Sequence, residues 1–306
     1  MSQKKGIVLR GTGGVWHVRA ESGEVHEASL RGRLKLDREE ARKLAVGDHV
    51  VLEIDQRGAA WTITEILPRH SQLARRAPGE GQGERIVAAN VDQVVVVFAA
   101  AKPEPHRRML DRFLVIAEAN SLDARVVINK VELVERDAAE RDFAAYVAAG
   151  YAVHFTSVKQ RIGLEDLHDQ LSGKTSVLTG PSGVGKSSLM NAMYPGLDLR
   201  VGEISESVNK GRHTTVGGYL HPLPGDAGGY VADTPGLREI GMWALAPESL
   251  DACFPELRPY LSHCRFADCR HTVEPDCAVR AAVDAGEVSA ARYESFLKLR
   301  RELEGE

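Results

Sequence analysis

A glycine-rich segment in the middle of the chain has the residue types and the spacing of a phosphate-binding loop. Residues 180–187 are GPSGVGKS, which fits G-x-x-x-x-G-K-[ST], and they lie between the strand-like TSVLT and the helix-competent SLMNAMY. Glycines let backbone N–H groups wrap around phosphates, and the following helix adds its positive end. Lys186 would reach the β- and γ-phosphates, and Ser187 would hold Mg²⁺. The pattern predicts a site for a nucleoside triphosphate.

A second segment suggests which base is bound. Residues 129–132 are NKVE, at the end of the strand-like ARVVI, and resemble the N-K-x-D motif of GTPases. In that motif a carboxylate accepts hydrogen bonds from guanine N1–H and the exocyclic amine, and such a buried pair discriminates by about 1–3 kcal/mol. Glu132 stands where aspartate is usual, so the acceptor chemistry is retained on a longer side chain. The segment predicts guanine preference.

Two further segments at predicted strand ends complete a GTPase-like set. Residues 156–159, TSVK, resemble the S-A-K loop that packs behind guanine. Residues 233–236, DTPG, fit D-x-x-G, which places Asp233 near Mg²⁺ and allows Gly236 to donate its N–H to the γ-phosphate. Together with the P-loop, these segments indicate a GTPase.

The segment GRHTT, residues 211–215, supplies the candidates for a switch loop. Either Thr214 or Thr215 could close on Mg²⁺ and the γ-phosphate. Leu237 follows the D-x-x-G glycine, where many GTPases have a water-orienting glutamine. His213 is the nearest side chain that could position or deprotonate the attacking water. The alternative is a loop histidine that contacts RNA or has no role.

The order of these segments differs from that of a conventional GTPase. NKVE and TSVK precede the P-loop, and DTPG comes last, so the sequence predicts a circularly permuted domain. The segment after Asp233 then leads directly into the C-terminal tail. On this interpretation, a movement at Gly236 driven by the γ-phosphate would pull on whatever the tail binds. Unchanged hydrogen exchange in the tail would refute it.

The four cysteines all lie in the last quarter of the chain. Cys264, Cys269, His271 and Cys277 place three thiolates and one imidazole within fourteen residues. Cys₃His is a usual tetrahedral set for structural zinc, and it leaves no open position for a substrate. The spacing therefore predicts a structural zinc site, with unmetallated thiols as the alternative. We expect Cys253, eleven residues upstream, to pack in the tail's core.

Composition sets the frame for these sites. The chain has 306 residues, a net charge of −4, 43% hydrophobic and 27% charged residues, which indicates a globular protein of two or three domains. Its longest strongly apolar run, residues 94–101, is too short to cross a bilayer, and no apolar signal segment opens the chain. We expect a cytoplasmic protein without a membrane contact. Residues 1–43 carry ten Lys/Arg against six Asp/Glu, which suits a phosphate backbone or a solvated basic turn.

The pattern of the elements predicts three domains and a linker. Short strands at 6–10, 15–20, 25–28, 49–54 and 61–66 predict an all-β OB-fold barrel, with an SH3-like barrel as the alternative. Strand-like and helical runs then alternate, which predicts an α/β P-loop domain with a mostly parallel sheet, followed by a cysteine-bearing helical tail. The predicted bounds are 1–70 for the OB-fold domain, 71–85 for a Gly-rich linker, 86–245 for the permuted GTPase domain, and 246–306 for the zinc-binding domain.

Taken together, the chain resembles the bacterial ribosome small-subunit-dependent GTPase A family (RsgA, also called YjeQ). The resemblance covers essentially the whole chain. It depends on the permuted order NKVE, GPSGVGKSS, GRHTT, DTPGLRE and CRFADCRHTVEPDCAV, and on the segments AANVDQVVVVFAA and AGEVSAARYESFLKL. It implies an OB domain, a permuted GTPase domain and a zinc domain. It further implies late maturation of the 30S subunit, binding of 16S rRNA, and GTP hydrolysis stimulated by that subunit.

The motifs and the resemblance define the candidate site residues. His213 matches the family's proposed catalytic histidine, and Lys186 would stabilise transition-state charge. The candidate GTP contacts are Asn129, Lys130, Val131, Glu132, Ser157, Gly180, Pro181, Ser182, Gly183, Val184, Gly185, Lys186, Ser187, Ser188, Thr214, Thr215, Asp233 and Gly236. The candidate metal ligands are Cys264, Cys269, His271 and Cys277 for zinc, and Ser187, Thr215 and Asp233 for Mg²⁺.

Two other functions are compatible with the sequence. A P-loop ATPase or kinase would have an accidental NKVE match and would bind ATP as well as GTP. A nucleotide-gated rRNA-binding adaptor without enzymatic activity would be consistent with Leu237 in place of the glutamine. We expect the protein to be a monomer that binds GTP and GDP and acts on the 30S subunit.

Overall fold

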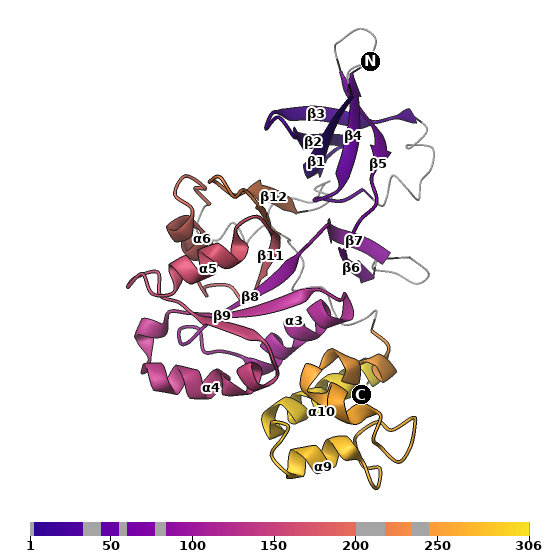
Figure 1. Ribbon diagram of the computed structural model, residues 1–306, viewed down its shortest axis with the longest axis vertical. Coiled ribbons are helices and arrows are strands. Elements are labelled where there is room, and N and C mark those ends of the chain that lie inside the picture. The colour runs from indigo at the N-terminus through magenta and orange to yellow at the C-terminus, as the bar shows by residue number, and fades with distance from the viewer. Residues whose placement is uncertain are drawn as a thin grey trace.

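The computed structural model describes residues 3–32, 44–54, 60–76, 84–199, 218–233 and 245–305. A barrel, an α/β domain and a helical tail follow one another from the top to the bottom of Figure 1. No helix in these described ranges is both long and apolar enough to span a membrane.

The N-terminal part is a closed barrel with the strand order β1-β2-β3-β5-β4. Its described strands are β1 (Gln3–Thr12), β2 (Val15–Ala20), β3 (Val25–Leu30), β4 (His49–Ile54) and β5 (Trp61–Ile66). Alternate residues point inward, so Val18, Leu52 and Ile63 share one core. Closure through a parallel β3–β5 pair is the arrangement of an OB barrel. The OB-fold prediction is confirmed over the SH3-like alternative.

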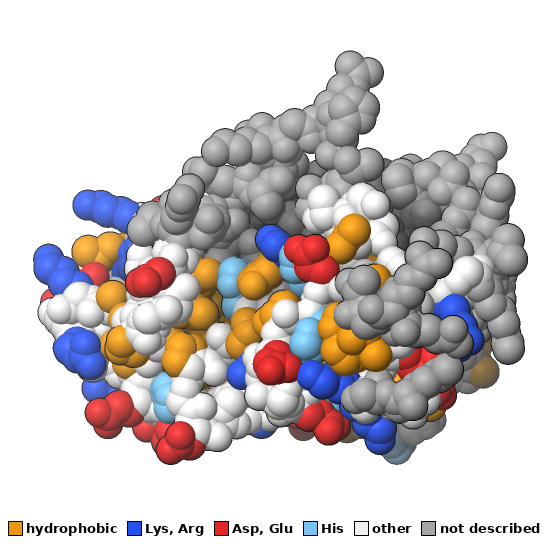
Figure 2. All heavy atoms as spheres, turned by 90° about the horizontal axis from the view of Figure 1, so that it is seen from above, with side chains coloured by type: hydrophobic (Ala, Val, Ile, Leu, Met, Phe, Trp, Pro, Cys, Tyr) orange, Lys and Arg blue, Asp and Glu red, His pale blue; other side chains and the backbone are white. Residues whose placement is uncertain are grey.

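Figure 2 views the molecule from the barrel end. Hydrophobic and histidine side chains occupy a central band of this face, and acidic and basic side chains are interspersed around it. Basic side chains on the described part of this face are therefore scattered among acidic ones.

The α/β domain is built on a six-stranded sheet with the order β10-β9-β8-β11-β13-β12. All neighbours are parallel except β12, which forms an antiparallel hairpin with β13. The mostly parallel sheet was predicted, and the strand-like runs 219–223 and 230–232, joined by PGDAGG, predict the hairpin. The strands are β8 (Gln93–Ala99), β9 (Asp123–Asn129), β10 (Ala152–Phe155), β11 (Thr175–Thr179), β12 (Tyr219–Pro222) and β13 (Tyr230–Asp233).

Helices cover both faces of this sheet, which explains the uninterrupted apolar run in β8. Val94, Val96 and Phe98 face the core beneath two helices, while Val95 and Val97 face the core on the opposite side. The first pair of helices is α3 (Arg107–Ala119) and α4 (Arg136–Ala148), and the second is α5 (Leu164–Leu171) and α6 (Lys186–Met193). Helical stretches of the sequence around residues 107–119, around 135–149 and after Lys186 predict α3, α4 and α6, whereas α5 was not predicted.

The predicted linker is wrong for part of its length. β6 (Gln72–Arg76) and β7 (Glu84–Ala89) pair as an antiparallel hairpin. Leu73 and Ala88 are fully buried in the core of the α/β domain, and the Asn120 side chain accepts a hydrogen bond from the Ala74 N–H at 3.2 Å. Burial of Leu73 therefore outweighs the polar, Gly-rich composition of this segment. Residues 77–83 lie outside the described part.

The barrel joins the α/β domain through a close backbone contact. Gly47 has φ +86°, and a Cβ there would lie 2.1 Å from the Ala89 carbonyl oxygen, so only glycine fits. Asn90 donates to the Gly47 carbonyl at 2.9 Å. Beside it, the fully buried Asp48 accepts from Arg69 at 2.6 Å.

The tail consists of short helices, as predicted. These helices pack around an apolar core of their own. Leu250, Phe254, Val279, Phe296 and Leu299 are buried there. The elements are η3 (Pro247–Ser249), η4 (Asp251–Cys253), η5 (Pro255–Leu257), α8 (Arg258–Leu261), α9 (Ala278–Asp284) and α10 (Ala290–Glu304).

Candidate nucleotide-binding and metal-binding sites

The predicted nucleotide residues meet at one edge of the sheet. Parallel strands β9, β10, β11 and β13 end side by side, and ligands of open α/β sheets bind beyond such carboxyl ends. Asn129 is the last residue of β9, Thr156 follows β10, Gly180 follows β11, and Asp233 ends β13. Segments from distant parts of the sequence are thus brought together.

The glycines of the loop between β11 and α6 are required by its geometry. Gly180 has φ +133°, and a Cβ there would lie 2.0 Å from the carbonyl oxygen of Val97. Gly185 has φ +95°, and its Cβ would lie 2.6 Å from Nδ2 of Asn129. Any side chain at either position would displace β8 or the NKVE segment.

The loop also fixes the lysine and the serine that follow it. Lys186 is 4% exposed, and its Nζ donates to the carbonyl oxygens of Gly180 at 2.9 Å and of Pro181 at 2.8 Å. The ammonium group is therefore held inside the curve of the loop, where phosphate oxygens would gather. Ser187 is buried in the first turn of α6.

Asn129 connects the NKVE segment to this loop. Its Nδ2 donates to the Val184 carbonyl at 2.9 Å, and its Oδ1 accepts from Thr156 Oγ1 at 3.2 Å. Both side chains are buried, at 2% and 0% exposure. The backbone adds a link, because the Val131 N–H donates to the Thr156 carbonyl at 3.2 Å. Three predicted motifs are thus joined by one amide side chain, which we call the Asn129 latch.

Lys130 and Glu132 flank the latch. Lys130 has φ +61°, and its Nζ donates to the carbonyl oxygens of Gly183 at 2.6 Å and of Lys102 at 2.5 Å. Glu132 lies in a single 3₁₀ turn, η1 (Val131–Leu133), and its Oε2 is buried without a hydrogen-bond partner. A buried carboxylate oxygen without a partner is costly, so it is an acceptor available to a ligand.

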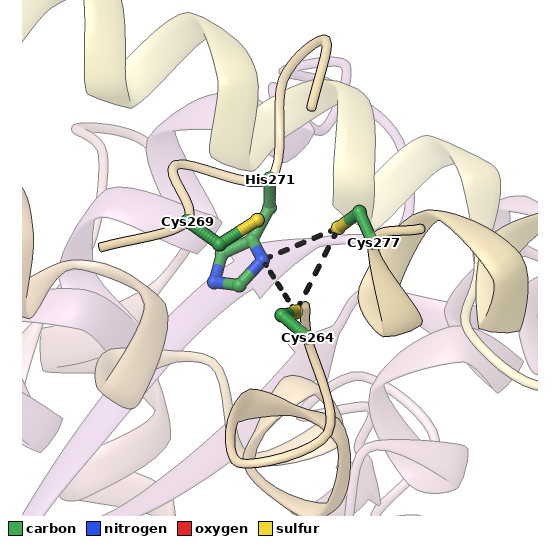
Figure 3. A group of neighbouring side chains, drawn as sticks. All are labelled: Cys264, Cys269, His271 and Cys277. Atoms are coloured by element: carbon green, nitrogen blue, oxygen red, sulfur yellow. Dashed lines mark hydrogen bonds between the residues drawn. The ribbon is translucent and has the colours of Figure 1, made fainter. Parts of the chain in front are cut away.

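The four predicted zinc ligands also lie close together. The ligand atoms of Cys264, Cys269, His271 and Cys277 all lie within 4.8 Å of one another (Figure 3). His271 Nδ1 is 3.4 Å from Cys277 Sγ and 3.5 Å from Cys264 Sγ, and the two sulfurs are 3.9 Å apart. Tetrahedral bonds of about 2.0–2.3 Å require ligand separations of roughly 3.4–3.8 Å. The donor set therefore fits a metal ion.

Asp251 completes the surroundings of this cluster. Its Oδ2 lies 3.2 Å from His271 Nε2, which leaves Nδ1 facing the three sulfurs. Burial lowers the pKa of His271, but hydrogen bonds to Asp251 and Cys277 outweigh it and raise the pKa to about 9. The carboxylate and the thiols around the His271 imidazole therefore favour its protonated, positively charged form.

Cys253 is not part of the cluster. It is buried in the tail's core, and burial raises the pKa of its thiol to about 11. It packs as an inert apolar side chain, as predicted.

Comparison with known proteins places the chain in a family. The RsgA GTPase family model matches residues 66–243, and the RsgA N-terminal domain model matches residues 5–62. The chain belongs to the RsgA GTPase family. It is an enzyme that hydrolyses GTP, and the predicted family resemblance is confirmed.

Relatives of this RsgA-family chain match nearly its full length. The "Small ribosomal subunit biogenesis GTPase RsgA" of Gemmatimonas aurantiaca is 62% identical over 301 residues, which cover 98% of this chain and 97% of the relative. The protein of the same name from Bacteroides fragilis is 35% identical, covering 96% of each chain. The crystal structure of YjeQ from Thermotoga maritima has a TM-score of 0.81 and 36% identity over 100% of both chains. YloQ, "a circularly permuted GTPase", has a TM-score of 0.75 and 29% identity, covering 99% of this chain and 96% of YloQ.

Several RsgA candidate residues lie outside the described ranges, namely His213, Thr214, Thr215 and Gly236. Of Asp233, the structure gives its position at the end of β13. Conversely, sequence reasoning missed the roles of Thr156 and Asp251. Thr156 immediately precedes the serine of TSVK, so a role for it could have been predicted from its position in the motif. The spacing of residues gives no indication of a role for Asp251.

Proposed function

We propose that this RsgA-family GTPase assists late maturation of the 30S ribosomal subunit, binds 16S rRNA, and hydrolyses GTP with stimulation by the small subunit. The observation that carries the nucleotide part is the Asn129 latch, which joins the guanine-type motif to the P-loop. The names of the relatives support the ribosomal part. We further propose a monomeric, cytoplasmic protein.

The P-loop and the Asn129 latch would bind opposite ends of GTP. Backbone N–H groups of the P-loop and Lys186 would hold the phosphates, while Glu132 Oε2 would accept from the guanine N1–H and exocyclic amine. The remaining contacts are proposed for Lys130, Val131, Ser157, Pro181, Ser182, Gly183, Ser188, Thr214, Thr215 and Gly236.

Hydrolysis requires charge neutralisation and an aligned water. Ser187, Thr215 and Asp233 are the proposed ligands of Mg²⁺, which would supply positive charge to neutralise the phosphates. Lys186 would stabilise charge that develops on the leaving phosphate. We propose that His213 orients the attacking water when the small subunit orders its loop.

The metal in the tail is proposed to be zinc with a structural role. Cys264, Cys269, His271 and Cys277 would supply all four ligands of a tetrahedral zinc ion and leave no position for a substrate. Zinc would organise loops that have little apolar core of their own.

The barrel offers a feature suited to RNA. His26 stacks on Trp61 with ring centroids 4.5 Å apart, and Lys4 Nζ lies 5.1 Å from the Trp61 ring. Aromatic platforms beside cations bind unpaired bases without strict sequence preference. This site supports rRNA binding.

The test is steady-state GTP hydrolysis with and without purified small ribosomal subunits, with ATP and large subunits as controls. A rise specific to GTP and the small subunit is expected. Equal use of ATP would favour the P-loop ATPase. Tight GTP binding without any stimulated turnover would instead favour the adaptor.

A further inference from the structure

Helix α3 belongs to two cores at once. Leu110, Phe113 and Leu114 are buried against the sheet of the α/β domain, whereas Val115 is buried in the tail's core. Figure 1 shows α3 between the sheet and the tail helices. The helix therefore has little free surface on either side, and any change in the tail's packing reaches it directly.

A buried arginine joins the tail to this helix. Arg292 of α10 donates from Nε to Glu256 Oε1 at 2.6 Å and from Nη1 to Asp111 Oδ1 of α3. The three side chains are 2%, 9% and 3% exposed. The guanidinium also lies 4.7 Å from the Phe254 ring and 5.2 Å from the Tyr146 ring. One cation thus neutralises two buried carboxylates from different domains.

The same short segment of the tail connects this ion pair to the metal cluster. Asp251, at its start, contacts His271 Nε2 at 3.2 Å, and Glu256, five residues later, contacts Arg292. Phe254 lies between them and packs edge-on against Phe296 of α10. The position of Asp251 depends on the imidazole that it orients, so a change at the metal site reaches Glu256 through the short segment 251–256, in which Cys253 and Phe254 are buried.

From this chain of contacts we propose that metal binding in the tail and the local stability of α3 are thermodynamically linked through Arg292. Metal binding fixes residues 251–256, which holds Glu256 and Arg292 against Asp111. By reciprocity, loss of the Arg292 contact weakens metal binding. The linkage makes the metal site a stabiliser of the GTPase domain as well as of the tail.

The experiment measures hydrogen exchange of residues 107–119 in the full-length protein, with zinc loaded and after removal by a chelator. Removal is expected to raise exchange of the slowest α3 amides, while the barrel strands β1 to β4 stay unchanged. Arg292→Met in the zinc-loaded protein is expected to raise α3 exchange about a hundredfold or more, because it leaves two buried carboxylates unpaired. Arg292→Met should also lower the affinity for Zn²⁺ about tenfold, as measured in a competition titration with a chromogenic chelator.

Glu302→Gln is the matched control. Glu302 of α10 also pairs across the same junction, with Arg112 of α3, but the side chains of Arg112 and Glu302 are 30% and 43% exposed. Exposed pairs contribute little, so α3 exchange and zinc affinity should change less than threefold. Should Arg292→Met fail to fold, Arg292→Lys retains the charge, loses the planar fork, and should give about a tenfold effect.

The proposal is overturned if chelation loosens the tail while α3 exchange stays at its zinc-loaded value. It is equally overturned if the folded Arg292 variants bind zinc as the unmodified protein does. Both readouts are independent of GTP hydrolysis and RNA binding.

Discussion

Because of the Asn129 latch, we predict that Thr156 affects nucleotide affinity although we propose no contact between Thr156 and the nucleotide. Thr156→Val replaces the hydroxyl by a methyl group of similar size and leaves Asn129 Oδ1 buried without its donor at 3.2 Å. Loss of a hydrogen bond that leaves a buried acceptor unsatisfied costs about 1–2 kcal/mol. Because the latch joins the guanine-type motif to the P-loop, this cost should divide between a lower free energy of unfolding and a weaker affinity for GDP, each measurable by titration.

A double-mutant cycle tests this reasoning. Asn129→Ala removes both bonds, so Thr156→Val added to it should cost almost nothing further, which gives a coupling of about 1 kcal/mol. Ser172→Ala is the control, since Ser172 Oγ makes a comparable 2.9 Å bond to the His168 carbonyl at the far end of α5. It should affect stability alone. If Thr156→Val costs the same with and without Asn129, the hydroxyl acts elsewhere and the latch is refuted.

Three other predictions concern the base, the loop and the metal. Glu132→Ala should lower the ratio of GTP to ATP affinity about 10- to 200-fold, and a variant that still strongly prefers GTP would contradict the base contact. Gly180→Ala should abolish nucleotide binding, because its Cβ would overlap the Val97 carbonyl, whereas Gly196→Ala, with φ +93° and nothing within 4 Å, should cost only about 1–3 kcal/mol of unfolding free energy. Zinc binding should release a proton from His271, whose pKa is raised to about 9 despite burial by its bonds to Asp251 and Cys277. Zinc affinity should therefore strengthen from pH 7 to pH 9, and calorimetry in buffers of different ionisation enthalpy would count the protons released by the imidazole and the thiols together; a zinc affinity that does not change over this pH range would contradict the prediction.

Much of the fold was predictable because its elements follow simple periodicities. The barrel strands alternate inward and outward, so the predicted bounds of β2, β4 and β5 agree with the observed ones. The hairpin β6–β7 was not predictable, since β6 contributes Leu73 to the core within an otherwise polar segment. Helix α5 was missed although Leu164, Leu167 and Leu171 are spaced as one buried face, because the segment is only eight residues long.

The candidate sites were predictable where chemistry fixes the spacing. The P-loop glycines and the Cys₃His set could be located from the sequence because phosphate and tetrahedral metal binding each demand a narrow set of residues. Asp251 and Arg292 could not, since each acts through a contact at least twenty residues away in the sequence or between domains. Such contacts leave no local periodicity. They become visible only when the tail is seen against α3.

The docked tail constrains how the nucleotide state could be transmitted. The interpretation that movement at Gly236 pulls on the tail requires α10 to shift relative to α3. Breaking the buried Arg292–Asp111 pair costs about 3–5 kcal/mol, more than the 1–3 kcal/mol of a typical allosteric coupling. At its other end, α3 follows a loop whose Lys102 carbonyl is held by Lys130 of the guanine motif.

We therefore expect α3 and α10 to respond to nucleotide together. Hydrogen-exchange rates measured with GDP and with a non-hydrolysable GTP analogue should differ in both residues 107–119 and residues 290–304, or in neither segment. Arg292→Met should uncouple the two helices, while the exposed-pair variant Glu302→Gln should leave them coupled. In the unmodified protein, a nucleotide-dependent change in hydrogen exchange that is confined to α10 would show that the tail moves independently of α3. Direct pulling through the segment after Asp233 requires such independent movement.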